Sequence, residues 1–278
     1  MPFKTLLSVI GVDQSDRDLQ TAIGLCQETG AHLSVLVVAL AAPPPIGEYA
    51  AVVSDAWLEE READMNRLRE TAARMTARLA DTDVSADVDS TYSEIAWAND
   101  VIGRRARYAD LTVLGPDLLT GADLRNTALS GALFESAKPV LIVPEGRAPT
   151  LRPKRVLVAW GSRPEAVRAV REALDLLTGA EDVRVVLVDP QASDLGNGPE
   201  PGADIAAYLT RHGVKVSVDR LPSSGQSVAT VLKQHATDMD ADLVVMGGYG
   251  HSRLRERIFG GVTRSMLDEP VLPMLMAR

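Results

Sequence analysis

The chain has 278 residues, 24% of them charged and 46% hydrophobic, which is close to the average of soluble globular proteins and argues against global disorder. A formal net charge of −9 repels a nucleic-acid backbone over most of the surface, so no nucleic-acid partner is expected. The single cysteine, Cys26, cannot form an internal disulfide, and no apolar run approaches the roughly 20 residues that span a bilayer. We therefore expect a soluble cytoplasmic protein with no membrane partner.

The first half alternates apolar runs with helical segments. Strands are predicted at Leu6–Val12, His32–Leu40, Val84–Thr91, Ala109–Gly115 and Pro139–Val143. Helices are predicted at about Asp16–Thr29, Asp55–Leu79, Ser93–Arg107 and Leu124–Ala137. Continuous apolar strands separated by helices are typical of a parallel sheet that is buried on both faces.

The second half repeats this order. Strands are predicted at Arg155–Trp160, Val183–Val188, Val214–Leu221, Asp242–Gly247 and Pro270–Ala277. The repeat is also visible in the residues, because ADLTVLGP from Ala109 matches ADLVVMGG from Ala241. We therefore predict an α/β fold of two doubly wound five-stranded parallel sheets in tandem, each with strand order 3-2-1-4-5. The predicted domains are residues 1–146 and 152–278, joined by a linker within Glu145–Lys154.

In such a sheet a ligand binds beyond the carboxyl ends of the strands, here between the first and fourth strands of a repeat. In the second half the fourth strand runs into a glycine-rich segment, with Gly247, Gly250, Gly260 and Gly261 followed by a threonine. Glycines let backbone approach a phosphate, and helix-terminal N–H groups attract it. Three glycines at a fixed spacing are common by chance, so the position of this segment is the informative feature.

Two segments resemble the universal stress protein family. The nucleotide-binding members of that family have a segment with Gly-x-x-Gly, then nine residues, then Gly-Ser/Thr. The segment from Met246 to Leu267, MGGYGHSRLRERIFGGVTRSML, is similar to it. The segment that begins at Val158, VAWGSRPEAVRAVREAL, is similar to the opening strand and helix of the family. The resemblance implies an adenine-nucleotide alpha-hydrolase-like fold that binds ATP with Mg²⁺ in the second half. The implied nucleotide-binding residues are Val188, Met246, Gly247, Gly250, Arg253, Gly260, Gly261, Val262 and Thr263.

Each half departs from the family pattern. The second half has Gly261 where Ser or Thr is usual, and Gly161 where the family has an Asp near the adenine. The first half keeps this acid as Asp13, but Pro116-Asp117-Leu118 follows Gly115, and the later Gly-Ser aligns with Leu129-Ser130. The resemblance therefore implies that Asp13, Gly115 and Ser130 are remnants of a site that no longer binds ATP.

These features favour a non-enzymatic stress-response or signalling protein. A protein-interaction module with degenerate sites and a slow ATP hydrolase remain as alternatives. No catalytic residue is identified, and the scattered histidines indicate no metal site. Partner proteins are expected, and the apolar edge strands at Pro139–Val143 and Pro270–Ala277 are predicted to cover one another, which would make the chain an intrachain pseudo-dimer. A homodimer of whole chains would need a different surface.

Overall fold

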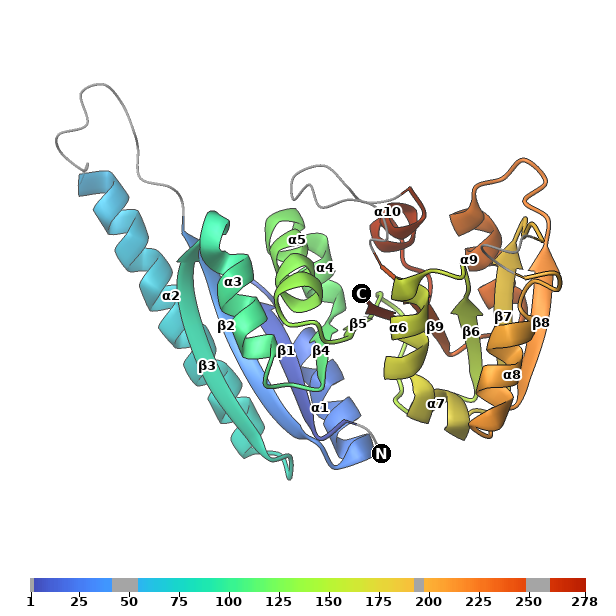
Figure 1. Cartoon of the computed structure of the whole chain (residues 1–278). Helices are drawn as coiled ribbons and strands as arrows, with labels where there is room; N and C mark the ends of the chain where they lie inside the picture. The colour runs from blue at the N-terminus through green and yellow to red at the C-terminus, as the bar shows by residue number, and fades with distance from the viewer. Residues whose placement is uncertain (1–2, 42–54, 193–197, 249–260) are drawn as a thin grey trace, which may run out of the picture. The chain divides into compact units, whose positions relative to one another are not determined.

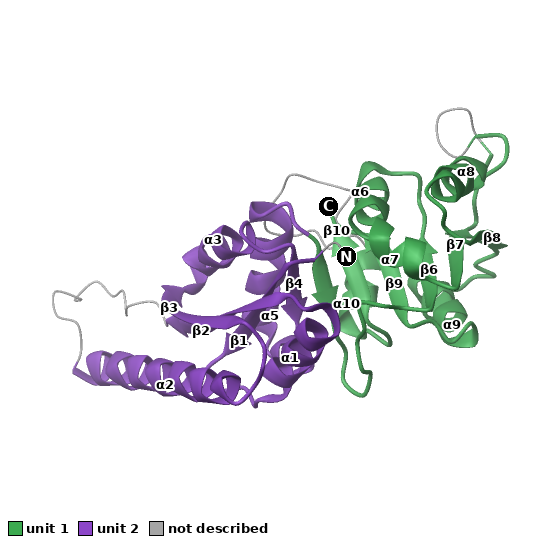
Figure 2. Ribbon diagram, turned by 90° about the horizontal axis from the view of Figure 1, so that it is seen from below, with its two compact units in different colours: residues 1–2, 139–278 green, residues 3–138 purple. Residues whose placement is uncertain are grey.

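The computed structural model describes residues 3–41, 55–192, 198–248 and 261–278 (Figure 1). The chain divides into two compact units, which are coloured separately in Figure 2. Unit 2 is Phe3–Lys138, and unit 1 contains Pro139–Arg278. In both units helices alternate with mostly parallel strands, which confirms the predicted α/β class.

Four parallel strands form the sheet of unit 2, in the order β3-β2-β1-β4. They are β1 (Thr5–Gly11), β2 (His32–Ala41), β3 (Ala86–Glu94) and β4 (Leu111–Leu114). In β1 the neighbouring residues Leu6 and Leu7 are both 0% exposed. Because successive side chains of a strand point to opposite faces, both faces of this strand are covered. The continuous apolar pattern of the sequence has this origin.

The helices of unit 2 lie on both faces of the sheet, with α2 on one side and α3 on the other (Figure 1). They are α1 (Arg17–Thr29), α2 (Asp55–Ala80), α3 (Ile95–Ala106), α4 (Pro116–Thr120) and α5 (Ala122–Ser130), followed by a π-helical turn, η1 (Gly131–Glu135). The 26-residue helix α2 buries few side chains, the first of them at Leu68. None of the helices in the described parts of the chain has the length and apolar character needed to cross a membrane.

Unit 1 contains a six-stranded sheet in the order β5-β10-β9-β6-β7-β8. Its strands are β5 (Val140–Ile142), β6 (Arg155–Ala159), β7 (Asp182–Val188), β8 (Val216–Leu221), β9 (Leu243–Gly247) and β10 (Met274–Ala277). Its helices are α6 (Pro164–Glu172), α7 (Leu174–Gly179), α8 (Ala203–Arg211), α9 (Val228–Asp238) and α10 (Gly261–Asp268). Strands β6 to β10 are ordered 3-2-1-4-5, as predicted for the second repeat.

The prediction of two separate five-stranded parallel sheets is wrong in one respect. Strand β5, which ends the first sequence repeat, pairs antiparallel with β10 of the second, with Leu141 opposite Leu275. Both side chains are 0% exposed. Pairing two apolar edge strands satisfies their backbone groups, so the hydrogen-bonded sheet continues from one sequence repeat into the other instead of ending at each.

The aspartates of the two ADL segments have matching structural roles. In unit 2 the Asp110 carboxylate accepts hydrogen bonds from the backbone N–H groups of Lys4 and Thr5, at 2.7 and 3.1 Å. In unit 1 the Asp242 carboxylate accepts hydrogen bonds from the N–H groups of residues 154 and 155, at 2.8 and 2.9 Å. Each carboxylate thus fixes the start of the first strand of its repeat beside the fourth. The sequence match therefore reflects a shared architectural contact rather than a ligand site.

Candidate functional site

A cavity of about 490 Å³ lies in unit 1 at the carboxyl ends of β6, β7 and β9. Strands β6 and β9 are the first and fourth strands of the second repeat, so the cavity lies where the strand order reverses. Its volume is within the range of small-molecule sites. The strand ends contribute mainly apolar groups to its wall, including Ala159, Val186, Leu187, Val188 and Met246.

Most of the residues proposed from the sequence lie in this cavity. Six of them line it: Val188, Met246, Gly247, Gly261, Val262 and Thr263. The other three, Gly250, Arg253 and Gly260, lie outside the described residues. The cavity wall thus joins the end of β7, the end of β9 and the first turn of α10, three segments that are far apart in the sequence.

Three helices begin at the cavity wall. Residues from the first turns of α6, α9 and α10 line it, among them Glu165, Val228 and Val262. The amino end of a helix carries a partial positive charge, so three such ends favour an anion. In α9 the Ser227 hydroxyl already accepts a hydrogen bond from the N–H of Thr230, and α6 begins with Pro164, which has no N–H. Arg163 also lines the cavity and adds a full positive charge, and the buried Thr263 contributes a hydroxyl. This part of the wall therefore has the donor groups and charge that suit an anion.

Gly247 is required for packing as well as for access to the cavity. A Cβ atom at this position would lie 2.5 Å from the backbone nitrogen of Ala166 and 2.5 Å from the carbonyl carbon of Glu165. Such distances are far below van der Waals contact, so any side chain would push α6 away from β9. Close packing of helix and strand is a known role of glycine in nucleotide-binding folds, and it explains this glycine without a ligand.

The cavity residues that sequence reasoning missed include Trp160 and Asp189, each of which directly follows a strand. Asp189 has a left-handed φ of 46° and accepts a hydrogen bond from the N–H of Ser223 at 2.9 Å. The hydroxyl and the N–H of Ser223 lower the pKa of the Asp189 carboxyl, which keeps it anionic. The signal that was available is position, because residues at the carboxyl ends of parallel strands face the ligand crevice.

Within the described residues, no cluster of three or more His, Cys, Asp or Glu side chains is arranged to hold a metal ion. A hard cation such as Mg²⁺ commonly binds through phosphate oxygens together with only one or two carboxylates. Glu165 and Asp189 both line the cavity, so theirs are the carboxylates that would complete such a shared site.

In the corresponding region of the first repeat, the side chain of Asp18 binds the backbone that follows the fourth strand. The Asp18 carboxylate is 1% exposed and accepts hydrogen bonds from the N–H groups of Asp117 and Leu118, each at 2.9 Å. Burial raises the pKa of Asp18, although both hydrogen bonds act in the opposite direction. Backbone donors that follow the fourth strand are thus bound internally and are not available to a phosphate.

The remnant residues of the first repeat are in different environments. Gly115 is buried against Asp18, and a Cβ on it would lie 2.3 Å from the Asp18 carboxyl carbon. Asp13 is exposed, and Ser130 is half-buried at the end of α5. Leu118 is 0% exposed and belongs to the core of unit 2. The backbone after β4 is therefore held by the Asp18 carboxylate.

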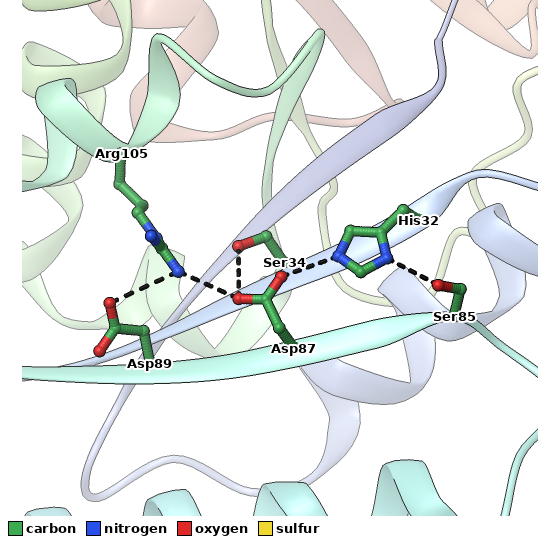
Figure 3. Close-up of polar contacts among 6 residues, drawn as sticks. All are labelled: His32, Ser34, Ser85, Asp87, Asp89 and Arg105. Atoms are coloured by element: carbon green, nitrogen blue, oxygen red, sulfur yellow. Dashed lines mark hydrogen bonds and ion pairs between the residues drawn. The ribbon is translucent and has the colours of Figure 1, made fainter.

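A polar cluster lies elsewhere in unit 2, at the start of β2 and β3 (Figure 3). His32 contacts Ser85 through Nδ1 and Asp87 through Nε2, both at 2.8 Å. The Asp87 carboxylate also accepts a hydrogen bond from Arg105 of α3 at 3.0 Å. These residues lie at the amino ends of the strands, opposite the end where ligands bind. The cluster therefore ties the edge strand β3 to β2 and α3.

Cys26 is not a reactive thiol. It is buried in α1, and burial raises the pKa of its thiol to about 12. The thiolate is the nucleophilic form of cysteine, so a thiol that stays protonated at neutral pH is inert. Unit 2 therefore gains no catalytic group from this residue.

Comparison with known proteins places the cavity within a recognised family domain. Residues 153–278 match the model of the universal stress protein family. This part of the chain is therefore a universal stress protein family domain, and it includes every residue that lines the cavity. No curated protein sequence matches the chain.

Solved structures resemble the chain along nearly its whole length. A universal stress protein from Archaeoglobus fulgidus DSM 4304 aligns with a TM-score of 0.66 and 17% identity, over 98% of this chain and 96% of that one. A candidate universal stress protein from Pseudomonas aeruginosa UCBPP-PA14 aligns at 0.57 and 16% identity, over 99% and 93%. A functionally unknown protein from Pseudomonas aeruginosa PAO1 aligns at 0.55 and 16% identity, over 99% and 92%. At such identities the likeness shows a shared fold.

Proposed function

We propose that this chain is a stress-response or signalling protein of the universal stress type that binds ATP with Mg²⁺ in the cavity of unit 1. The observation that carries the proposal is the convergence of three helix amino ends and an arginine on one cavity at the strand-order reversal. The apolar strand ends suit the adenine, and the helix ends suit the phosphates. We further propose a cytoplasmic location and no enzymatic step.

Binding of Mg-ATP should stabilise the folded protein. At a concentration 100-fold above Kd, a ligand that binds only the native state adds about 2.7 kcal/mol to the free energy of unfolding, which corresponds to several degrees in Tm. Thermal unfolding of the purified protein with and without Mg-ATP measures this shift. Chromatography of the supernatant after denaturation would also show whether adenine nucleotide is bound on purification.

The variant Gly261→Glu should abolish the shift. Gly261 lines the cavity at the first residue of α10, and among the described residues nothing comes within 4 Å of an added Cβ. A carboxylate there repels phosphate, yet it suits the positive end of the helix and should not unfold it. The matched control is Gly179→Glu, because Gly179 lies at the end of α7 and the described residues also leave open space around an added Cβ there. Wild-type protein that shows no shift with Mg-ATP would overturn the proposal and favour the interaction module.

Gly161→Asp is expected to tighten ATP binding about tenfold, the worth of one charge-assisted hydrogen bond. Gly161 lines the cavity where the family resemblance implies an acid near the adenine, and no part of the chain that the structure describes comes within 4 Å of an added Cβ. Isothermal titration calorimetry with Mg-ATP measures the change, and Gly179→Asp provides the same charge away from the cavity. Equal affinity of Gly161→Asp and wild type would mean that adenine does not occupy this side of the cavity.

A further inference from the structure

Trp160 is the aromatic residue among the described residues that line the cavity. Trp160 directly follows β6. Its backbone N–H donates a hydrogen bond to the Val186 carbonyl of β7 at 3.0 Å, so the backbone of Trp160 remains paired with that strand. Its side chain is half-buried and lines the cavity. A tryptophan whose ring is partly exposed in a ligand-sized cavity has a face available for contact.

The structure holds the ring of Trp160 in place. Its indole Nε1–H donates a hydrogen bond to the Ser162 hydroxyl at 3.0 Å. Ser162 has a left-handed φ of 50°, a conformation that is costly for a residue other than glycine. Between these two residues, Gly161 has no side chain, and the described residues beyond its chain neighbours leave the 4 Å around a Cβ position empty. The indole ring of Trp160 is therefore held by a hydrogen bond next to the open space at Gly161.

We propose that Trp160 stacks on the base of the ligand in this cavity, and that the site recognises the flat face of an aromatic heterocycle at this point. This inference rests on the proposed function for the identity of the ligand as an adenine nucleotide. The Asp that the family resemblance implies is replaced by Gly161, so that carboxylate is missing. Stacking does not depend on the pattern of hydrogen-bonding groups around a base, because every base has a π face.

Nearby residues complete a site for a base. Val188, Pro190 and Leu232 line the same cavity and provide apolar contacts, which exclude water from a stacked ring. The phosphate-binding side of the wall, at the starts of α6 and α10, is built from other residues. The contribution of Trp160 can therefore be separated from that of the phosphate contacts by choosing ligands that contain only one of the two parts.

The experiment compares Trp160→Leu with Trp160→Phe by isothermal titration calorimetry, using Mg-ATP, adenosine and tripolyphosphate as probes. Leu keeps apolar bulk without a ring, whereas Phe keeps a ring. Loss of base stacking should weaken binding of Mg-ATP and of adenosine about 5- to 100-fold in Trp160→Leu. Trp160→Phe should lose less than about fivefold, since part of the stacking surface remains. The affinity for tripolyphosphate should be the same in all three proteins.

Fluorescence provides an independent readout. The chain has three tryptophans, and the other two, Trp57 and Trp97, belong to unit 2. Adenosine should change the emission of the wild type and of the control Trp97→Phe, whose target residue is 63% exposed. It should leave the emission of Trp160→Phe unchanged.

The outcomes separate this inference from the proposed function. Equal affinity of wild type and Trp160→Leu for Mg-ATP would overturn the stacking inference and leave ATP binding intact. Adenosine binding that depends on Trp160, together with no binding of Mg-ATP, would support stacking and overturn the proposed function. Failure of the wild type to bind either compound would overturn both.

Discussion

Leu141→Glu is expected to lower the free energy of unfolding of the sheet of unit 1 by more than about 4 kcal/mol, because it places an unpaired carboxylate where an apolar side chain was buried. Leu141 is the central residue of the three-residue strand β5 and is 0% exposed. It lies opposite Leu275 of β10, which is also 0% exposed. A strand this short cannot tolerate the loss of its central contact, so β5 should separate from β10.

Urea denaturation and limited proteolysis measure this effect. Separation of β5 should expose the segment that follows it, so protease cutting within residues 145–154 should increase. Val271→Glu is the matched control, since Val271 lies shortly before β10 but is 40% exposed. That variant should change the free energy of unfolding by less than about 1 kcal/mol. Unchanged unfolding and unchanged cutting in Leu141→Glu would show that the β5–β10 pairing does not hold the sheet together.

Most strands could be predicted from the sequence because their apolar runs are continuous, whereas the edge strands β3 and β8 alternate polar and apolar residues. Buried parallel strands need apolar side chains on both faces, and few other structures impose such runs. The apolar character of β5 and β10 also indicated that these two strands would be covered. The antiparallel register of β5 on β10 could not be read in the same way, because it depends on which residues of two short apolar strands meet.

The candidate site was predictable in part. The glycine-rich segment after the fourth strand and the carboxyl ends of the strands indicated where the site lies, because the fold class predicts a ligand crevice at that edge of the sheet. The role of Asp18 was not predictable, since its partners are 99 and 100 residues away in the sequence. Leu118, which follows Asp117 in the segment that departs from the family pattern, is buried in the core. Contacts of such long range are fixed by tertiary packing and leave no local pattern.

Asp18→Ala is expected to lower the free energy of unfolding of unit 2 by about 2–4 kcal/mol, because two buried N–H donors lose their acceptor. The donors belong to Asp117 and Leu118, and both hydrogen bonds measure 2.9 Å. Asp123→Ala is the control, since Asp123 is exposed, and removal of its carboxylate should cost no more than about 0.5 kcal/mol.

The loss should also depend on pH. Burial raises the pKa of Asp18 above its ordinary value of 3.8, so the folded state holds this proton more tightly than the unfolded state. A group of this kind contributes most stability below its unfolded pKa, and this contribution falls as the pH rises through the folded pKa. The difference in unfolding free energy between wild type and Asp18→Ala should therefore be larger near pH 4 than near pH 8. Urea denaturation at several pH values measures it, and a difference that increases with pH would show that hydrogen bonding to the carboxylate, rather than burial, sets the pKa of Asp18.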